Sequence, residues 1–158
     1  MIRTQARAAL AVAILAATSA GIASAQGPKP DDEIRYRQSV MHVIGRAMGP
    51  MGAMAQGKAP FNAAVAQKNS ALVDSLLGLP WGSFGPGTDK GAPNKAGAKI
   101  WSDAAKFKQS AEAGQKAVAN LAAAARTGDE AKFKAAFGDV GKACKACHDD
   151  FRTKEMHN

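Results

Sequence analysis

The segment from Cys144 to His148 constrains this chain more than any other feature of its sequence. It reads Cys-Lys-Ala-Cys-His and contains both cysteines of the chain. On a helix, two thiols three residues apart lie on one face, and the histidine follows one turn beyond the first thiol. This C-x-x-C-H spacing is typical of covalent haem attachment, since both thiols can bond to one haem edge while the imidazole reaches the iron. We therefore expect one covalently bound haem c, attached through Cys144 and Cys147, with His148 as the axial ligand of the iron.

A cysteine pair of this spacing has two other possible roles. A dithiol of the thioredoxin type belongs in a βαβ context, which the surrounding sequence does not indicate. Half of a zinc site needs two further ligands, and only His42 and His157 could offer them. Haem attachment explains the spacing better than either alternative.

The first 25 residues have the pattern of an export signal. Arg3 and Arg7 precede an apolar run over residues 8–17, and the stretch closes with Ala-Ser-Ala at positions 23–25. The run is shorter than the roughly 20 apolar residues that a transmembrane helix needs. We expect cleavage after residue 25, with a retained N-terminal anchor as the alternative. Because haem c is attached outside the cytoplasm, the expected location is a bacterial periplasm, and residues 26–158 form one domain.

Composition and periodicity predict an all-α domain. Alanine is abundant, β-branched residues are few, and no stretch alternates apolar and polar residues over the length of a strand. Four helical segments are expected: from Pro30 to near Gly57, from Phe61 to Gly78, from Ser102 or Asp103 to Thr127, and from Asp129 through the cysteine motif. Pro50 should kink or interrupt the first.

The stretch from Gly78 to Lys99 separates the second and third helical segments. Its glycines and prolines leave no room for a regular element, and a loop of this length is expected to cross and cover the domain. Trp81 and Phe84 would pack it onto the helices. The predicted fold is therefore a four-helix bundle with a long crossover between helices 2 and 3. The apolar line of the last helix puts the cysteine motif on its core-facing side: Phe133, Phe137, Val140, Cys144, Cys147, Phe151.

The charges narrow the choice of partners. The chain carries a formal net charge of +8, but its cations are scattered among acidic residues. No basic patch with interleaved aromatic residues appears, so we expect no nucleic-acid binding. A mildly basic surface suits docking to an acidic redox partner, although ordinary solvated helix faces explain the same charges.

Three stretches carry a specific family resemblance. They are Tyr-Arg-Gln-Ser at residues 36–39, the crossover residues 79–88 with residues 100–103, and residues 136–152 around the cysteine motif. Together they resemble cytochrome c′, the class II c-type cytochromes, which are four-helix bundles. The resemblance spans residues 26–158. It implies that Arg37 and Gln38 lie near the haem propionates, with a solvated face as the alternative, and that Arg152 lies beside His148. A cation that complements the helix dipole is the alternative for Arg152.

The resemblance also places Met41 over the iron, on the side opposite His148. In most relatives this residue is apolar and does not ligate, which leaves a five-coordinate, high-spin iron that binds NO or CO. In low-spin relatives a methionine binds the iron and the protein is an electron carrier, since a thioether ligand raises the potential and blocks gas binding. Plain core packing is the usual role of a methionine on an apolar helix face. We expect the gas-binding form, taking part in electron transfer or NO protection, with His148/Met41 ligation as the alternative.

Two further expectations concern enzymatic activity and assembly. A peroxidase would need a distal acid–base residue. His42 lies about 100° around the helix from Met41 and should face solvent, and His157 should fray with the chain end. We therefore expect no enzymatic activity. Relatives form homodimers through their first two helices, so we expect a homodimer that does not contact the membrane after signal cleavage. The sequence does not identify the redox partner.

Overall fold

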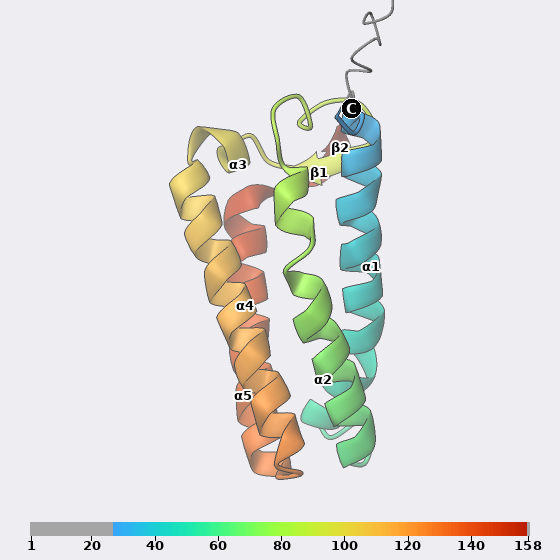
Figure 1. Cartoon of the computed structure of the whole chain (residues 1–158). Helices are drawn as coiled ribbons and strands as arrows, with labels where there is room; N and C mark the ends of the chain where they lie inside the picture. Colours follow the sequence, from blue (N-terminus) through green and yellow to red (C-terminus); the bar gives the residue numbers. More distant parts are fainter. Residues whose placement is uncertain (1–26, 158) are drawn as a thin grey trace, which may run out of the picture.

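The structure is a computed structural model that describes residues 27–157 (Figure 1). The predicted signal peptide, residues 1–25, therefore lies outside the described residues. Within the described part, no helix combines the length and the apolar character that crossing a membrane requires.

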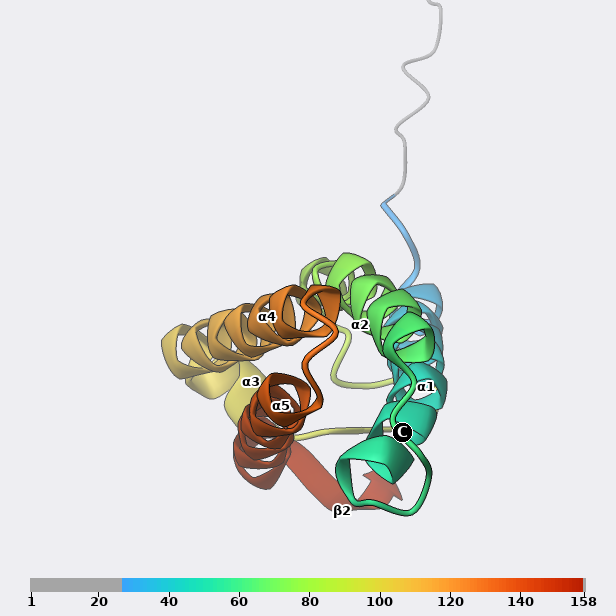
Figure 2. The ribbon, with the colours of Figure 1, turned by 90° about the horizontal axis from the view of Figure 1, so that it is seen from below.

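Four long helices form a bundle, as the sequence predicted. They are α1 (Pro30–Ala55), α2 (Ala63–Leu77), α4 (Ala104–Arg126) and α5 (Glu130–Phe151). Helix α1 packs on α2, α2 on α4, and α4 on α5, while α1 and α5 make fewer close approaches. Figure 2 shows the four helices arranged around a common interior, with α5 lying beside α4. Each helix therefore packs against its neighbours in the sequence.

Local chemistry sets the helix ends close to their predicted positions. Asn62 caps α2 by accepting a hydrogen bond from the Val65 N–H at 3.0 Å, and Asp129 caps α5 in the same way through the Lys132 N–H at 3.0 Å. Gly128 follows α4 with a φ of 71°, a conformation that favours glycine.

Helix α1 continues without interruption through Pro50 to Ala55, so the expected interruption does not occur, while a kink at Pro50 stays a prediction. The proline removes one backbone donor, but its ring is exposed, whereas Ala47 and Met51 on either side are buried in the core. Packing of this apolar face holds the helix together across the proline.

The crossover contains regular elements that the sequence did not predict. These are the 3₁₀ turn η1 (Pro80–Ser83), the strand β1 (Asn94–Ala96) and the short helix α3 (Lys99–Ser102). Strand β1 pairs antiparallel with β2 (Arg152–His157), so that Asn94 lies opposite His157. The expectation of a frayed His157 is wrong, because its Nε2 lies 2.8 Å from the carbonyl oxygen of Ala96. The pairing forms because the end of α5 brings two segments together whose backbone groups would otherwise lack partners.

Aliphatic side chains and one phenylalanine fill the centre of the bundle. All four helices contribute to this core, whose larger members are Val40, Ile44, Met51, Met54, Val73, Leu77, Val118, Leu121, Phe133 and Val140. Met41 of α1 and Cys144 of α5 are partly buried and pack against the same core. The cysteine motif therefore lies on the core-facing side of α5, as predicted.

Candidate functional site

The two cysteines occupy a partly covered stretch of the core-facing stripe on α5. Val140 and Phe151, on the same stripe, are only 1% and 3% exposed. Cys144 and Cys147 lie between them, and both are half-buried and free of disulfide bonds. The side chains of this stripe are less deeply buried at the two cysteines than at Val140 and Phe151. Both thiols are therefore accessible to another apolar group.

The environment of the thiols argues against a reactive dithiol. Burial raises the pKa of Cys144. Burial also raises the pKa of Cys147, with smaller contributions from Cys144 and Asp150. Redox-active Cys-x-x-Cys pairs instead have a thiol with a lowered pKa.

His148 follows the thiols and lies on an exposed part of α5. Desolvation lowers its pKa, and the positive charge of Arg152 lowers it further, against an opposing effect of Asp149. These effects favour the neutral imidazole, which is the form that binds iron.

Arg152 lies close to His148, but it follows the end of the helix instead of continuing it. Helix α5 ends at Phe151, and Arg152 begins β2 with an extended backbone, φ −117° and ψ 129°. Its backbone N–H donates to the carbonyl oxygen of His148. The pairing of β2 with β1 takes the chain out of the helix at this point, so β2 rather than helical periodicity positions the arginine.

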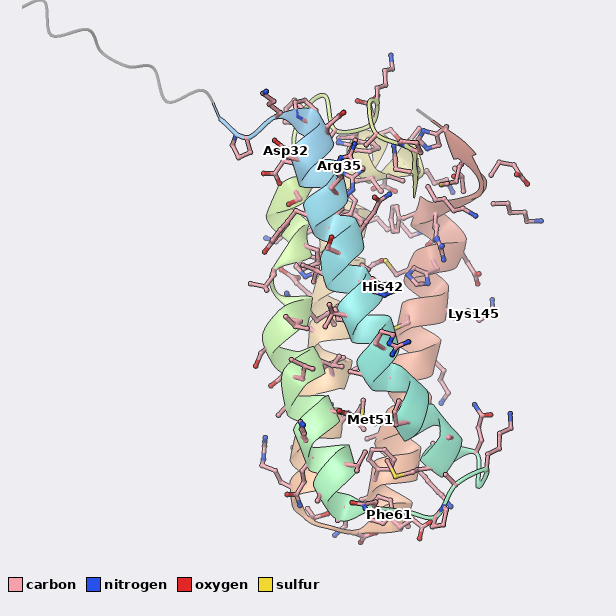
Figure 3. All side chains as sticks on the ribbon, turned by 90° about the vertical axis from the view of Figure 1, so that its right-hand side faces the viewer. Asp32, Arg35, His42, Met51, Phe61 and Lys145 are labelled. Carbon is pink, nitrogen blue, oxygen red and sulfur yellow. The ribbon has the colours of Figure 1, made fainter. Side chains whose placement is uncertain are left out.

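Met41 lies in the same apolar interior as Cys144. Figure 3 shows the neighbouring residues His42 on α1 and Lys145 on α5 at a similar height along the bundle. His42 is exposed, as predicted. Met41 and the attachment residue Cys144 thus contact the same core, and the ligation state of Met41 stays a prediction.

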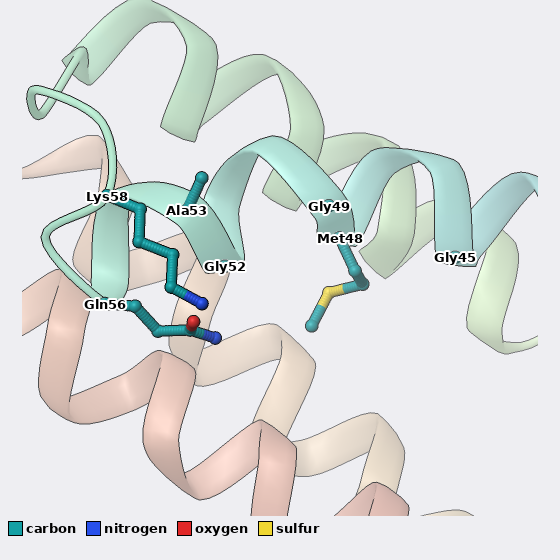
Figure 4. A pocket seen from close by; sticks show the side chains of 7 residues that line it. All are labelled: Gly45, Met48, Gly49, Gly52, Ala53, Gln56 and Lys58. Carbon is teal, nitrogen blue, oxygen red and sulfur yellow. The ribbon is translucent and has the colours of Figure 1, made fainter.

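An open groove runs along α1 beyond Met41. It is lined mainly by small residues, namely Gly45, Met48, Gly49, Gly52, Ala53, Gln56 and Lys58 (Figure 4). Met41, Gly45, Met48 and Gly52 recur at helical spacing and share a face of α1. A Cβ atom on Gly52 would lie 3.4 Å from Cζ of Phe137, so the groove borders α5.

A zinc site finds no support in the described part of the chain. Residues 27–157 contain no group of three or more His, Cys, Asp or Glu side chains placed to hold a metal ion. His157, one of the two candidate ligands, is bonded to the crossover strand β1.

Arg37 is almost fully buried, with 4% of its surface exposed, and its side chain binds the crossover. Nη1 donates to the Ser83 carbonyl at 2.8 Å and to Oγ1 of Thr88 at 3.1 Å. Nη2 donates to the Thr88 carbonyl at 2.8 Å and to Oδ1 of Asn94 at 3.5 Å. The guanidinium carbon lies 4.4 Å from the centre of the Phe84 ring, a cation–π contact.

Gln38 also binds the crossover, through an Nε2–H that donates to the Pro93 carbonyl at 2.8 Å. The structure therefore places both predicted propionate-binding residues as clamps between α1 and the crossover. Their contact with haem propionates stays a prediction.

An aromatic cluster joins the crossover to the end of the cysteine-bearing helix. The Phe84 and Phe107 ring centres are 4.9 Å apart, and those of Phe107 and Phe151 are 5.2 Å apart. Trp81 stacks on Phe84, with the ring centres 6.4 Å apart, and also packs against the core. The sequence predicted that Trp81 and Phe84 pack on the bundle, but it did not indicate a role for them at the site. Phe151 lies three residues from His148, so the cluster reaches the cysteine motif.

The indole nitrogen of Trp81 supplies a test of whether these residues fit a bound haem. Nε1 is buried and has no hydrogen-bond partner within the described residues. Leaving a buried donor unpaired costs about 1–3 kcal/mol, which an acceptor on a bound group would offset. With the two half-buried thiols, this donor makes the site fit a large apolar group that also carries acceptors, as haem c does.

Comparisons with known proteins agree with this arrangement. A family model described as Cytochrome C′ matches residues 32–152. The cytochrome c′ of Rubrivivax gelatinosus is 54% identical over 129 residues, which cover 82% of this chain and 100% of the relative. The cytochrome c′ of Alcaligenes xylosoxydans xylosoxydans is 46% identical over 130 residues, with the same 82% and 100% coverage.

Solved structures resemble the fold as closely. A crystal structure of the Rubrivivax gelatinosus cytochrome c′ superposes with a TM-score of 0.77 at 54% identity, covering 80% of this chain and 99% of that one. A nitric oxide complex of a mutant cytochrome c prime from Alcaligenes xylosoxidans superposes with a TM-score of 0.76 at 45% identity, covering 82% and 100%.

Proposed function

The chain belongs to the cytochrome c′ family, and from this premise we propose that it is a periplasmic cytochrome that binds NO and CO at an open axial position of its haem iron. The family binds haem c, and the two cysteines suit its covalent attachment. In this proposal Cys144 and Cys147 hold the haem, and His148 provides one axial ligand. When bound, haem c would supply an iron that accepts a diatomic ligand.

The packing of Met41 carries the proposal of an open position. Its side chain is partly buried against an aliphatic core, and such packing accounts for the methionine without iron ligation. The nearby polar residues of α1 point elsewhere, because His42 is exposed and Arg37 is bonded to the crossover. An apolar surface at Met41 favours small neutral ligands over anions, which lose more solvation on entry.

Mutants of the Alcaligenes xylosoxidans cytochrome c prime have been solved with bound nitric oxide, which supports NO as a ligand here. NO protection and electron transfer are the roles that we propose. No enzymatic role is proposed, because His42 is exposed and His157 is bonded to β1, which leaves neither placed as a distal acid–base residue.

Absorption spectra of the oxidised and reduced holoprotein, before and after CO, test this function. We expect a high-spin oxidised spectrum and immediate CO binding, both retained in Met41→Leu. Met48→Leu is the matched control, because Met48 is also partly buried against the core and lies two turns along the same face of α1.

Sharp low-spin bands without a CO response would contradict the proposal. If Met41→Leu then became high-spin and bound CO while Met48→Leu did not, Met41 would be the sixth ligand. The protein would then be the electron carrier with His148/Met41 ligation.

A homodimer through α1 and α2 is the proposed assembly. Large apolar side chains are exposed on both helices: Tyr36 at 44%, Val43 at 43%, Val65 at 37% and Leu72 at 40%. Tyr36 and Val43 are seven residues apart on α1, so they share one face of that helix. Val65 and Leu72 have the same spacing on α2. Because α1 packs along α2, a second copy of the chain could cover these four side chains together.

Export through the segment 1–25 is proposed because this segment has the pattern of a signal peptide. The intact mass of the periplasmic protein should equal that of residues 26–158 plus one haem.

A further inference from the structure

The two tryptophans of the chain differ in how their indole N–H groups are satisfied. Nε1 of Trp101 donates to the carbonyl oxygens of Phe84 at 2.9 Å and Gly85 at 3.3 Å. Nε1 of Trp81 is buried without any partner in the described part of the chain. Buried donors in native proteins are almost always paired, so this N–H points to an acceptor that a bound group supplies.

The surrounding aromatic rings hold the Trp81 indole in place. Its ring stacks on Phe84 with an interplanar angle of 21° and meets Phe107 edge-on at 5.9 Å. Phe84 is itself covered by the guanidinium of Arg37. Turning the N–H toward solvent would therefore disrupt contacts with two other rings.

The position of Trp81 limits which group can supply the acceptor. Trp81 packs against the same core as Met41 and Cys144, so it borders the interior where haem c is attached. The four ring nitrogens of a haem are bonded to its iron, and its strong acceptors are the two carboxylates. The residues expected to bind these carboxylates, Arg37 and Gln38, already donate to the crossover.

We propose that Nε1–H of Trp81 donates a hydrogen bond to a carboxylate of the bound haem c. Trp81 is then a haem-binding residue, which orients the carboxylate edge of the haem beneath the crossover. The inference rests on haem attachment, and it does not depend on the spin state of the iron or on the gas that it binds.

The test compares the Trp81→Phe holoprotein with Trp101→Phe. Both variants remove one indole N–H and keep an aromatic ring, but only the first removes the proposed donor. Resonance Raman spectra should show a shift of the haem carboxylate bending mode in Trp81→Phe alone. Because a hydrogen bond to a carboxylate stabilises its charged form, the carboxylate-linked inflection in the pH dependence of the reduction potential should also move to higher pH in that variant alone.

A second preparation guards against misfolding of Trp81→Phe. Incorporation of 5-fluorotryptophan into the Trp101→Phe protein places the label at Trp81 alone and makes its N–H a stronger donor. The bending mode should then shift in the direction opposite to that in Trp81→Phe.

Two results would overturn the inference. One is a carboxylate mode that is the same in the parent, in Trp81→Phe and in the fluorinated protein. The other is a changed CO stretching frequency in Trp81→Phe with an unchanged carboxylate mode, which would mean that the indole contacts the gas ligand. Absence of a haem spectrum from the parent would count instead against haem attachment, so the two failures are distinguishable.

Discussion

Arg37 is a charged residue in a position that is nearly closed to solvent. Burial lowers its pKa, and the carboxylate of Glu33 opposes this effect. An arginine nevertheless stays protonated at neutral pH. The four hydrogen bonds to Ser83, Thr88 and Asn94 compensate for the lost solvation, so the side chain serves as a clamp between α1 and the crossover.

Replacing Arg37 should therefore destabilise the protein. Arg37→Met would leave the buried carbonyl oxygens of Ser83 and Thr88 without donors, and we expect the free energy of unfolding to fall by about 2–4 kcal/mol. Denaturant unfolding of the holoprotein, followed by far-UV circular dichroism, measures the loss. Arg35→Met is the control, since Arg35 is exposed on the same helix and its replacement should change the free energy by no more than about 0.5 kcal/mol. Equal losses in the two variants would contradict the clamp.

At the scale of elements, the pairing of β1 with β2 depends on a close approach at Gly97. Its N–H donates to the Phe151 carbonyl oxygen at 2.7 Å, and a Cβ atom at this position would lie 2.9 Å from the same oxygen. That oxygen belongs to the backbone at the end of α5. A Cβ atom on residue 97 could therefore be accommodated only if the backbone of the strand pair moved.

Gly97→Ala should for this reason lower the free energy of unfolding by about 1–3 kcal/mol and increase hydrogen exchange at the amides of β2. Gly138→Ala is the matched control, because a Cβ there meets nothing within 4 Å in the middle of α5. That change should stabilise the protein by about 0.5–1 kcal/mol. A Gly97→Ala protein as stable as the parent would show that the strand pair tolerates the extra atom.

The cap of α5 gives a prediction on pH dependence. The hydrogen bond from the Lys132 backbone N–H is the largest of the effects that lower the pKa of Asp129. A lowered pKa means that the charged carboxylate stabilises the folded protein above the usual carboxyl range and that this stability is lost as the pH falls through the lowered value. Asp129→Ala should thus reduce Tm at pH 7, and the difference from the parent should shrink in strong acid. A Tm difference that stayed constant between neutral and acidic pH would show that the carboxylate charge has no part in the cap.

For the whole molecule, the prediction concerns the proposed dimer interface, formed by the exposed apolar side chains of α1 and α2. Val43→Asp with Leu72→Asp would place charges in the proposed interface, and we expect the dimer to dissociate, because burying unpaired carboxylates is costly. Sedimentation equilibrium measures the association, and the absorption spectrum should stay unchanged. Ala119→Asp with Ala123→Asp is the control, since both alanines are exposed on α4. A dimer that survives the first pair and dissociates with the second would place the interface on α4.

Much of this molecule could be read from the sequence because the signals are local. The C-x-x-C-H spacing indicated the cofactor, since the attachment needs two thiols and an imidazole within five residues. Composition and helical periodicity predicted the four long helices, because both signals lie within the residues of one helix. The glycine- and proline-rich crossover likewise followed from residues 78–99 alone.

The tertiary structure decided the contacts that join distant segments. Arg37 meets partners that lie 46 to 57 residues further along the chain, and periodicity on α1 could not distinguish this clamp from a solvated arginine. Strand β2 exists because the end of α5 lies beside the crossover, although neither segment has a strand pattern of its own. The unpaired N–H of Trp81 was likewise not predictable from the sequence, because whether a buried donor has an acceptor depends on all the groups packed around it.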